Sequence, residues 1–244
     1  MRRFTGQSSN KLPLFFSEAI NAVSHLLYPS ICYGCKKHEI GENEWLCLSC
    51  LSTLPFTGFE NTRDNPVEQL FWGRTPIRFA SSCFFYAEKT PIQRLIHEVK
   101  YKEKQQLGRW LGQIMGRQLE TVFETNKVDL MLPMALHPKK QKQRGYNQAT
   151  LLCEGIHSIT ACDFTEQVLV RNTHTKTQTK KTRIERWDNV SEVFSITKTE
   201  AIINKHIVLV DDVITTGAST EACATTLINE GAHAVSICSL AFTL

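Results

Sequence analysis

The stretch "HIVLVDDVITTGAST" (residues 206–220) carries the strongest structural signal in this chain of 244 residues. An apolar run at residues 207–210 leads directly into Asp211 and Asp212, and a loop of small and hydroxylated residues follows. Short continuous apolar runs are typical of buried strands in parallel sheets. In open parallel sheets, ligands bind outside the carboxyl ends of the strands. We therefore expect both carboxylates at a ligand-binding edge of a sheet.

Strand-like and helix-like segments alternate on both sides of this stretch. Strands are predicted at residues 79–87, 128–134, 166–171, 191–196, 207–210 and 233–242. Helices are predicted at residues 90–101, 107–122, 145–159 and 218–230. This alternation predicts an α/β fold with a doubly wound, mostly parallel sheet. We expect this domain to cover residues 78–244, after a connector at 61–76 and a small N-terminal module, with a short helix, at 1–60.

The loop after the two aspartates is suited to an anion. Its backbone N–H groups and hydroxyls surround the start of a predicted helix, and Gly217 allows a close approach of the backbone. Carboxylates beside a phosphate are reasonable if the ligand also carries hydroxyls, as ribose 5-phosphate does, or if Mg²⁺ lies between them. The Gly-Lys-Ser/Thr of a nucleoside-triphosphate loop and the GxGxxG of a dinucleotide fold are both missing. A turn whose aspartates only cap backbone amides stays an alternative.

Residues 207–219, "IVLVDDVITTGAS", resemble the phosphoribosyl-pyrophosphate-binding motif of the type I phosphoribosyltransferases over all thirteen positions. The resemblance implies that Asp211 and Asp212 bind the ribose hydroxyls and belong to the catalytic site. It also implies contacts to the donor from the residues that follow, Val213, Thr215, Thr216, Gly217, Ala218, Ser219 and Thr220. The last six of these are expected to cradle the 5-phosphate.

Two basic segments, residues 139–144 and 171–186, hold ten of the 28 Lys and Arg residues and one acid. Each follows a predicted strand, so we expect both at the same sheet edge as Asp211. Basic side chains and Mg²⁺ would stabilise a departing pyrophosphate there. The predicted residues are His137, Lys139 and Arg144 for binding and Arg183 for leaving-group stabilisation, on a segment that closes over the site.

Other uses of the basic segments stay open. They can be two solvated loops. They can also hold single-stranded DNA, because lysine contacts to phosphates do not depend on sequence, and Tyr146 and Trp187 could stack on bases.

Four cysteines near the N-terminus, Cys32, Cys35, Cys47 and Cys50, form the pattern C-x₂-C-x₁₁-C-x₂-C. Two such thiolate pairs complete a tetrahedral site, so we expect a structural Zn²⁺ rather than a catalytic one. Two disulfides or a redox dithiol are the alternatives. The remaining cysteines are predicted to be small buried hydrophobic residues; they are Cys83, Cys153, Cys162, Cys223 and Cys238.

A four-cysteine knuckle ahead of a phosphoribosyltransferase-like domain resembles the ComF family of competence proteins, over about residues 28–242. The segment 84–112, which contains Lys100 and Tyr101, is similar to a family segment, and 132–152 resembles the "RGFNQ" region with Tyr146 in place of Phe. Positions in a predicted mobile loop also agree; they are Gln178, Arg183, Asn189 and Phe194. The chain departs from the pattern in residues 1–27, where only a helix is recognisable.

The resemblance implies binding of phosphoribosyl pyrophosphate with Mg²⁺ and transfer of the phosphoribosyl group to an acceptor that the sequence does not reveal. The alternative is a single-stranded DNA-binding accessory protein of natural transformation, with partners in the competence machinery. The net charge of +4 and 42% hydrophobic residues indicate an ordinary globular protein. Because no apolar run reaches the roughly 20 residues that a membrane span needs, we expect a cytoplasmic protein.

Overall fold

The computed structural model describes residues 30–41, 43–102, 104–171 and 193–243. The chain divides into two compact units, residues 1–52 and 53–244. In the first unit, α2 (Leu48–Ser52) follows a loop in which Ile31 and Glu39 form an antiparallel bridge. The predicted helix before residue 29 and the predicted site residue Arg183 lie outside the described residues, as do Gln178, Trp187 and Asn189.

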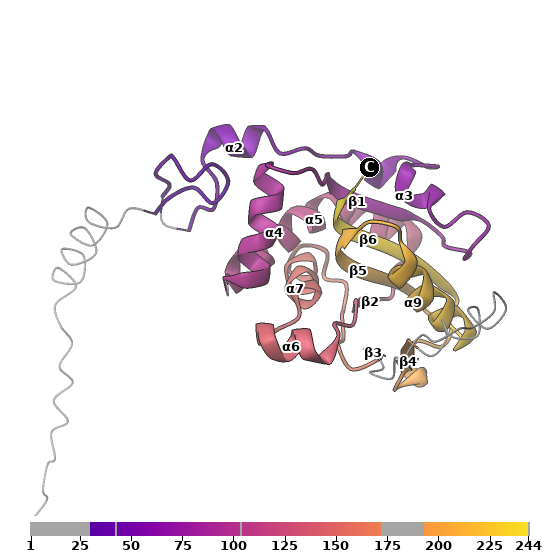
Figure 1. The fold of residues 1–244 in the computed structure, drawn as a ribbon. Helices are drawn as coiled ribbons and strands as arrows, with labels where there is room; N and C mark the ends of the chain where they lie inside the picture. The colour runs from indigo at the N-terminus through magenta and orange to yellow at the C-terminus, as the bar shows by residue number, and fades with distance from the viewer. Residues whose placement is uncertain (1–29, 42, 103, 172–192, 244) are drawn as a thin grey trace, which may run out of the picture. The chain divides into compact units, whose positions relative to one another are not determined.

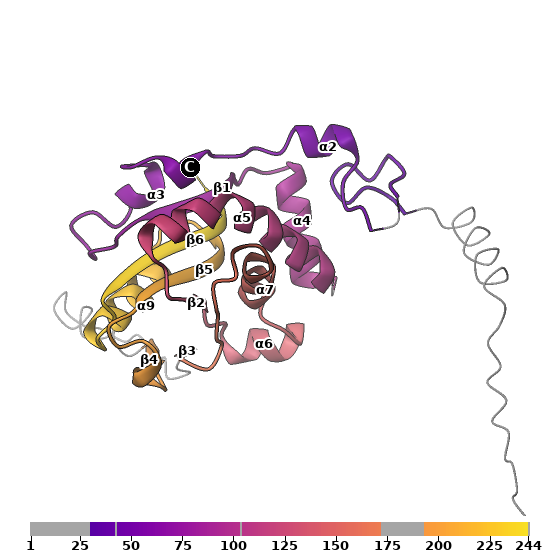
Figure 2. The same cartoon turned by 180° about the vertical axis from the view of Figure 1, so that it is seen from behind.

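The second unit is built on a four-stranded sheet in the order β1-β6-β5-β2. Its strands are β1 (Ala80–Phe85), β6 (Ala234–Phe242), β5 (His206–Ile214) and β2 (Leu130–Pro133). All three pairings are parallel. The α5 and α7 helices cover one face of the sheet and α9 covers the other (Figures 1 and 2). The predicted α/β class with a doubly wound, mostly parallel sheet is confirmed.

Helices connect the strands as the apolar periodicity predicts. The main helices are α4 (Pro91–Tyr101), α5 (Gln105–Asn126), α7 (Gln148–Thr160) and α9 (Ala218–Asn229). Shorter elements are α3 (Pro66–Gln69), α6 (Pro138–Arg144) and the 3₁₀ turns η1 (Phe59–Asn61) and η2 (Thr199–Ala201). None of the helices in the described part of the chain combines the length and the apolar character needed to cross a membrane.

Glycines set the distance between α5 and α7. A Cβ added to Gly155 would lie 2.1 Å from the carbonyl oxygen of Arg109, and one added to Gly112 would lie 2.4 Å from that of Leu152. The two helix backbones therefore touch where these glycines meet. This close contact positions the start of α7, which contributes to the site described below.

Two predicted strands do not belong to the parallel sheet. The segment at 166–171 forms β3 (Leu169–Arg171), which pairs antiparallel with β4 (Phe194–Ile196) in a separate two-stranded sheet. Val170 is 40% exposed, whereas central parallel strands are buried on both faces. The second basic segment therefore follows a strand outside the parallel sheet. Its first residue, Arg171, still lies near enough to Asp211 for its charge to act on that carboxyl group.

The scattered cysteines are mostly buried as predicted. Cys83, Cys153, Cys223 and Cys238 lie in the interior, but Cys162 is only partly buried. It follows the end of α7, and its backbone N–H donates to the hydroxyl of Thr160.

Candidate functional site

The two aspartates lie where β5 extends beyond its neighbour β2. The prediction ended this strand at residue 210, but β5 continues to Ile214 because β6 pairs with it as far as Phe242. On the other side, the pairing with β2 stops at Val210. Asp211 and Asp212 are therefore strand residues, and the β5 edge on their β2 side is free of sheet pairing among the described residues.

Strand alternation sends the two carboxylates to opposite faces of the sheet. Asp212 lines a small cavity together with Leu111 of α5 and Leu152 of α7. Asp211 faces α9, where burial, and after it the charge of Asp211, raises the pKa of Cys223. The two residues are joined by one hydrogen bond, in which the Asp212 N–H donates to Asp211 Oδ1 over 2.8 Å.

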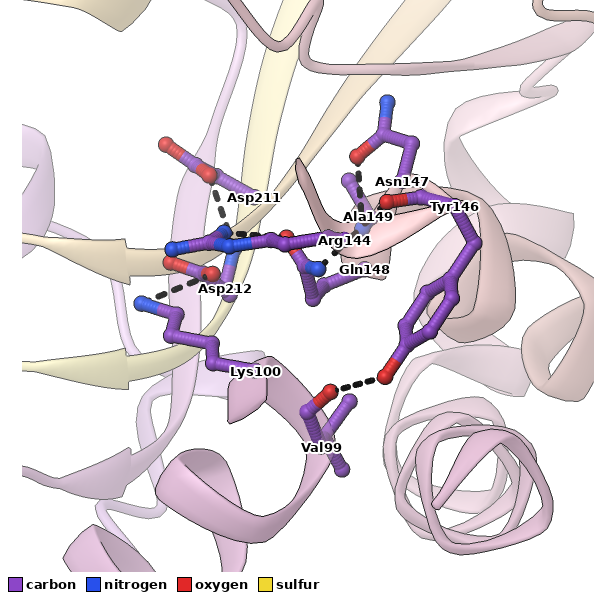
Figure 3. A network of polar contacts seen from close by, with 9 residues as sticks. All are labelled: Val99, Lys100, Arg144, Tyr146, Asn147, Gln148, Ala149, Asp211 and Asp212. Atoms are coloured by element: carbon purple, nitrogen blue, oxygen red, sulfur yellow. Dashed lines mark hydrogen bonds and ion pairs between the residues drawn. The ribbon is translucent and has the colours of Figure 1, made fainter. Parts of the chain in front are cut away.

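Lys100, in the last turn of α4, forms an ion pair with Asp212. The distance between Lys100 Nζ and Asp212 Oδ2 is 2.8 Å, and each side chain is 20% exposed (Figure 3). Lys100 was not among the predicted site residues. The resemblance of segment 84–112 pointed to Lys100 and Tyr101 but gave no reason to place them beside the aspartates.

Asp211 is an unusual carboxyl group. Burial, followed by the neighbouring charge of Asp212, raises its pKa to about 7, while the Asp212 N–H, Lys100 and Arg171 act in the opposite direction. The group therefore changes its charge near neutral pH. A hydroxyl donor or a cation that reached the carboxylate would stabilise its ionised form.

Arg144 reaches the aspartate pair through Gln148. Arg144 Nη1 donates to Gln148 Oε1 over 2.6 Å, and Gln148 lines the same cavity as Lys100 and Asp212. The guanidinium of Arg144 also lies 5.3 Å from the centre of the Tyr101 ring. The predicted residue Arg144 is thus brought close to the aspartates, whereas Lys139 is exposed on α6.

The segment between β2 and α7 contains a short helix, which argues against the alternative of a solvated loop. Residues 138–144 form α6, and His137 caps it, because its Nδ1 accepts a hydrogen bond from the Lys139 N–H over 3.2 Å. The Tyr146 hydroxyl donates to the carbonyl oxygen of Val99 (Figure 3). Since Tyr146 is held against α4 in this way, its predicted stacking on a base would require the ring to leave this position.

The predicted phosphate loop follows β5 and forms the start of α9. Gly217 is the N-cap residue of α9 and has φ +73°, a conformation that favours glycine. Thr215, Thr216 and Ser219 are exposed around it. Thr220 is 2% exposed and its hydroxyl donates to the Gly217 carbonyl oxygen over 2.9 Å, so this side chain supports the loop.

The first unit brings the four predicted zinc ligands together. The sulfur atoms of Cys32, Cys35, Cys47 and Cys50 all lie within 4.8 Å of one another. The Cys47 N–H donates to Cys32 Sγ, and backbone N–H groups, first that of Lys37, lower the pKa of Cys35 to about 6. Four convergent thiols with such donors fit a tetrahedral metal ion. His38, which lies in the sequence between the two cysteine pairs, is exposed and is not part of this cluster.

Comparisons with known proteins agree with the sequence resemblance. The DNA utilization protein YhgH of Escherichia coli K12 is 28% identical over 159 residues, which cover 63% of this chain and 68% of that protein. The resemblance to competence proteins is confirmed. Competence protein F of Haemophilus influenzae is 28% identical over 62% of this chain and 68% of its own length. ComFC of Bacillus subtilis is 34% identical over 47% of this chain and 43% of its own length. No protein-family model matches the chain.

Solved structures with a similar fold include phosphoribosyltransferases. A glutamine phosphoribosylpyrophosphate amidotransferase from B. subtilis superposes with a TM-score of 0.38 and 18% identity, over 53% of this chain and 25% of that one. A hypoxanthine phosphoribosyltransferase from Staphylococcus aureus gives a TM-score of 0.36 and 12% identity, over 55% of this chain and 64% of that one. This chain thus spans a quarter of the length of the amidotransferase. The aspartate site is inferred from the contacts of this chain's own residues and not from these superpositions.

Proposed function

We propose that this protein binds phosphoribosyl pyrophosphate together with Mg²⁺ and transfers the phosphoribosyl group to an acceptor. The observation that carries the proposal is the position of Asp211 and Asp212. They lie on the part of β5 that extends past β2, and two residues separate Gly217 from the end of this strand. One ligand that carries both a diol and a phosphate matches this combination of acceptors and N–H donors.

Each part of the site has a proposed role. Asp211 and Asp212 accept hydrogen bonds from the ribose hydroxyls, and the loop at 215–220, with the N-terminus of α9, holds the 5-phosphate. Val213 lies in the strand between these two parts. Lys100 neutralises Asp212, so that the donor meets one unpaired carboxylate rather than two.

The pyrophosphate is proposed to lie toward α6. His137, Lys139 and Arg144 supply positive charge or N–H donors on this side, and Arg144 is already held by Gln148. Arg183, outside the described residues, stays the proposed residue for leaving-group stabilisation. Carboxylate oxygens suit Mg²⁺, which would neutralise charge on the pyrophosphate.

Isothermal titration calorimetry tests the proposal. The wild-type protein should bind phosphoribosyl pyrophosphate in the presence of Mg²⁺, and the double variant Asp211→Asn/Asp212→Asn should bind it at least tenfold more weakly. Glu120→Gln, which removes an exposed charge on α5, is the matched control and should bind as the wild type does. Equal affinity of the double variant and the wild type would remove the site assignment. If the double variant does lose affinity, a screen of nucleobases and amines for pyrophosphate release would identify the acceptor.

The names of the relatives favour a second candidate, a role in DNA uptake with single-stranded DNA as a ligand. YhgH is named a DNA utilization protein, and the two other relatives are named competence proteins. The exposed lysines of α6 could contact phosphates. A steep loss of DNA affinity with salt, together with no turnover of phosphoribosyl pyrophosphate with any acceptor, would favour this candidate.

A further inference from the structure

A cavity of about 530 Å³ lies in the segment that leads into β1, away from the two aspartates in the sequence. Its lining comes from residues 63–78 and includes Phe71 and Trp72 after α3. This volume falls in the range of small-molecule sites, which are mostly apolar with a few placed polar groups. The segment was predicted to be only a connector.

Three arginines line this cavity, and hydrogen bonds to the protein anchor each of them. Arg63 Nη1 donates to the carbonyl oxygen of Arg78 over 3.2 Å, and Arg74 Nη1 donates to that of Leu70 over 3.0 Å. Arg78 Nε donates to Asn126 Oδ1 over 3.2 Å. A guanidinium carries five N–H donors, so these bonds fix its orientation and leave others for a ligand. Such pre-oriented forks suit a phosphate.

The acidic side chains near the arginines are largely engaged elsewhere. Glu68 is 8% exposed, and its carboxylate accepts hydrogen bonds from the N–H groups of Asp64 and Ala80. Glu221 of α9 is paired with Arg74. Asp64 also lines the cavity and is exposed. Because Arg63 and Arg78 donate to neutral oxygens, they, rather than Arg74, are the arginines that would meet an anionic ligand.

Trp72 provides the second half of a recognition surface. Its side chain is 57% exposed at the cavity, followed by Gly73 with φ +68°. An indole that is this exposed presents a large planar apolar surface to water. Stacking of a base on such a surface stabilises binding by about 1–3 kcal/mol. A ligand that combines a planar ring with an anion would use both the indole and the arginines.

We propose that this cavity is a nucleotide-binding site, with the base on Trp72 and the phosphate at Arg63 and Arg78. The site is distinct from the proposed donor site, and the proposal goes beyond the proposed function. Phe71 lies between the two, because it lines the cavity while a Cβ on Gly217 would come within 3.1 Å of its ring. The nucleotide unit can be free or part of a single strand.

Calorimetry on the full chain tests the proposal with adenosine monophosphate, inorganic phosphate and a 5′-phosphorylated trinucleotide as probes. Trp72→Ala and the double variant Arg63→Ala/Arg78→Ala should each weaken binding of adenosine monophosphate about tenfold or more. Trp72→Phe should keep most of the affinity because it retains an aromatic face. Arg117→Ala, which removes an exposed arginine from α5, should have no effect. Melting curves identify any variant that fails to fold.

The outcomes separate this site from the donor site. Adenosine monophosphate also carries a ribose 5-phosphate, so the Trp72 and arginine variants are compared in the Asp211→Asn/Asp212→Asn background. This background should still bind adenosine monophosphate at Trp72, whether or not it binds phosphoribosyl pyrophosphate. Binding of the trinucleotide more tightly than the mononucleotide would support the site and show that its source is a strand. No binding of either nucleotide at millimolar concentrations, equal affinity for phosphate alone, or unchanged affinity in Trp72→Ala would overturn the proposal.

Discussion

The pKa of Asp211 predicts how donor binding depends on pH. Burial raises this pKa to about 7, and the ionised carboxylate is the form that can accept two hydroxyl hydrogen bonds. If only the ionised form binds, the apparent Kd scales as one plus the ratio of protonated to ionised carboxyl. Between about pH 6 and pH 8 this factor falls about tenfold, or roughly 1.4 kcal/mol.

The assay is calorimetric titration of phosphoribosyl pyrophosphate with saturating Mg²⁺, repeated across this pH range. The phosphate groups of the donor titrate in the same range. The variant Asp211→Asn separates the two contributions, because it removes the carboxyl group and leaves the ligand unchanged. Its affinity should be lower, and its pH dependence should be that of the donor alone. Between pH 6 and pH 8, the logarithm of Kd should fall by close to one unit more for the wild type than for this variant.

Stability in the absence of ligand gives an independent measurement with a defined sign. The pKa of Asp211 is raised in the folded state from its ordinary value of 3.8, so its stabilising contribution is complete below pH 3.8 and is lost as the pH rises through about 7. The stability of Asp211→Asn relative to the wild type should therefore increase from pH 6 to pH 8, by roughly 1 kcal/mol. Parallel profiles of the two proteins, in both binding and unfolding, would refute the reasoning.

Three further predictions concern residues around the site and in the two units. Lys100→Met should move the midpoint of the donor-binding pH profile above pH 7, because Lys100 lowers the pKa of Asp211. Lys100→Arg should retain the wild-type midpoint. An unmoved midpoint in Lys100→Met would contradict this role of Lys100. Cys47→Ser should lose bound zinc by elemental analysis, whereas Cys162→Ser should keep it. Gly155→Ala should lower the Tm by several degrees, because overpacking costs about 1–3 kcal/mol and the added Cβ would lie 2.1 Å from a backbone oxygen; an unchanged Tm would rule out this tight contact.

Features with local causes were predictable from the sequence. The start of α4 is one example, because Thr90 accepts a hydrogen bond from the Gln93 N–H at the N-cap and Pro91 occupies the first helical position. The buried run of β5 is another, since four consecutive apolar residues have few other uses. The C-x₂-C pairs likewise predicted a convergent cluster, because each pair lies in one short segment of the first unit.

Features that depend on distant partners were not predictable. The extension of β5 through Ile214 is caused by β6, whose Ser239, Ala241 and Phe242 pair with the last residues of the strand. Periodicity over residues 207–210 contains no information about this partner. The antiparallel pairing of β3 with β4 has the same origin, because the pattern identified both segments as strands but contains no information about their partner.

Lys100 shows why the candidate site was only partly visible in the sequence. It precedes Asp212 by more than one hundred positions in the sequence. Their contact requires the end of α4 to lie beside the part of β5 that extends beyond β2. The last turn of α4 is held there from the other side by the Tyr146 hydroxyl on Val99 and by Arg144 over Tyr101. The segment resembling "RGFNQ" thus has a structural effect beyond its charge, because it fixes the helix that supplies a cation to one of the two acids. Loss of the Tyr146 hydroxyl should therefore alter the pH profile of donor binding in the same direction as Lys100→Met.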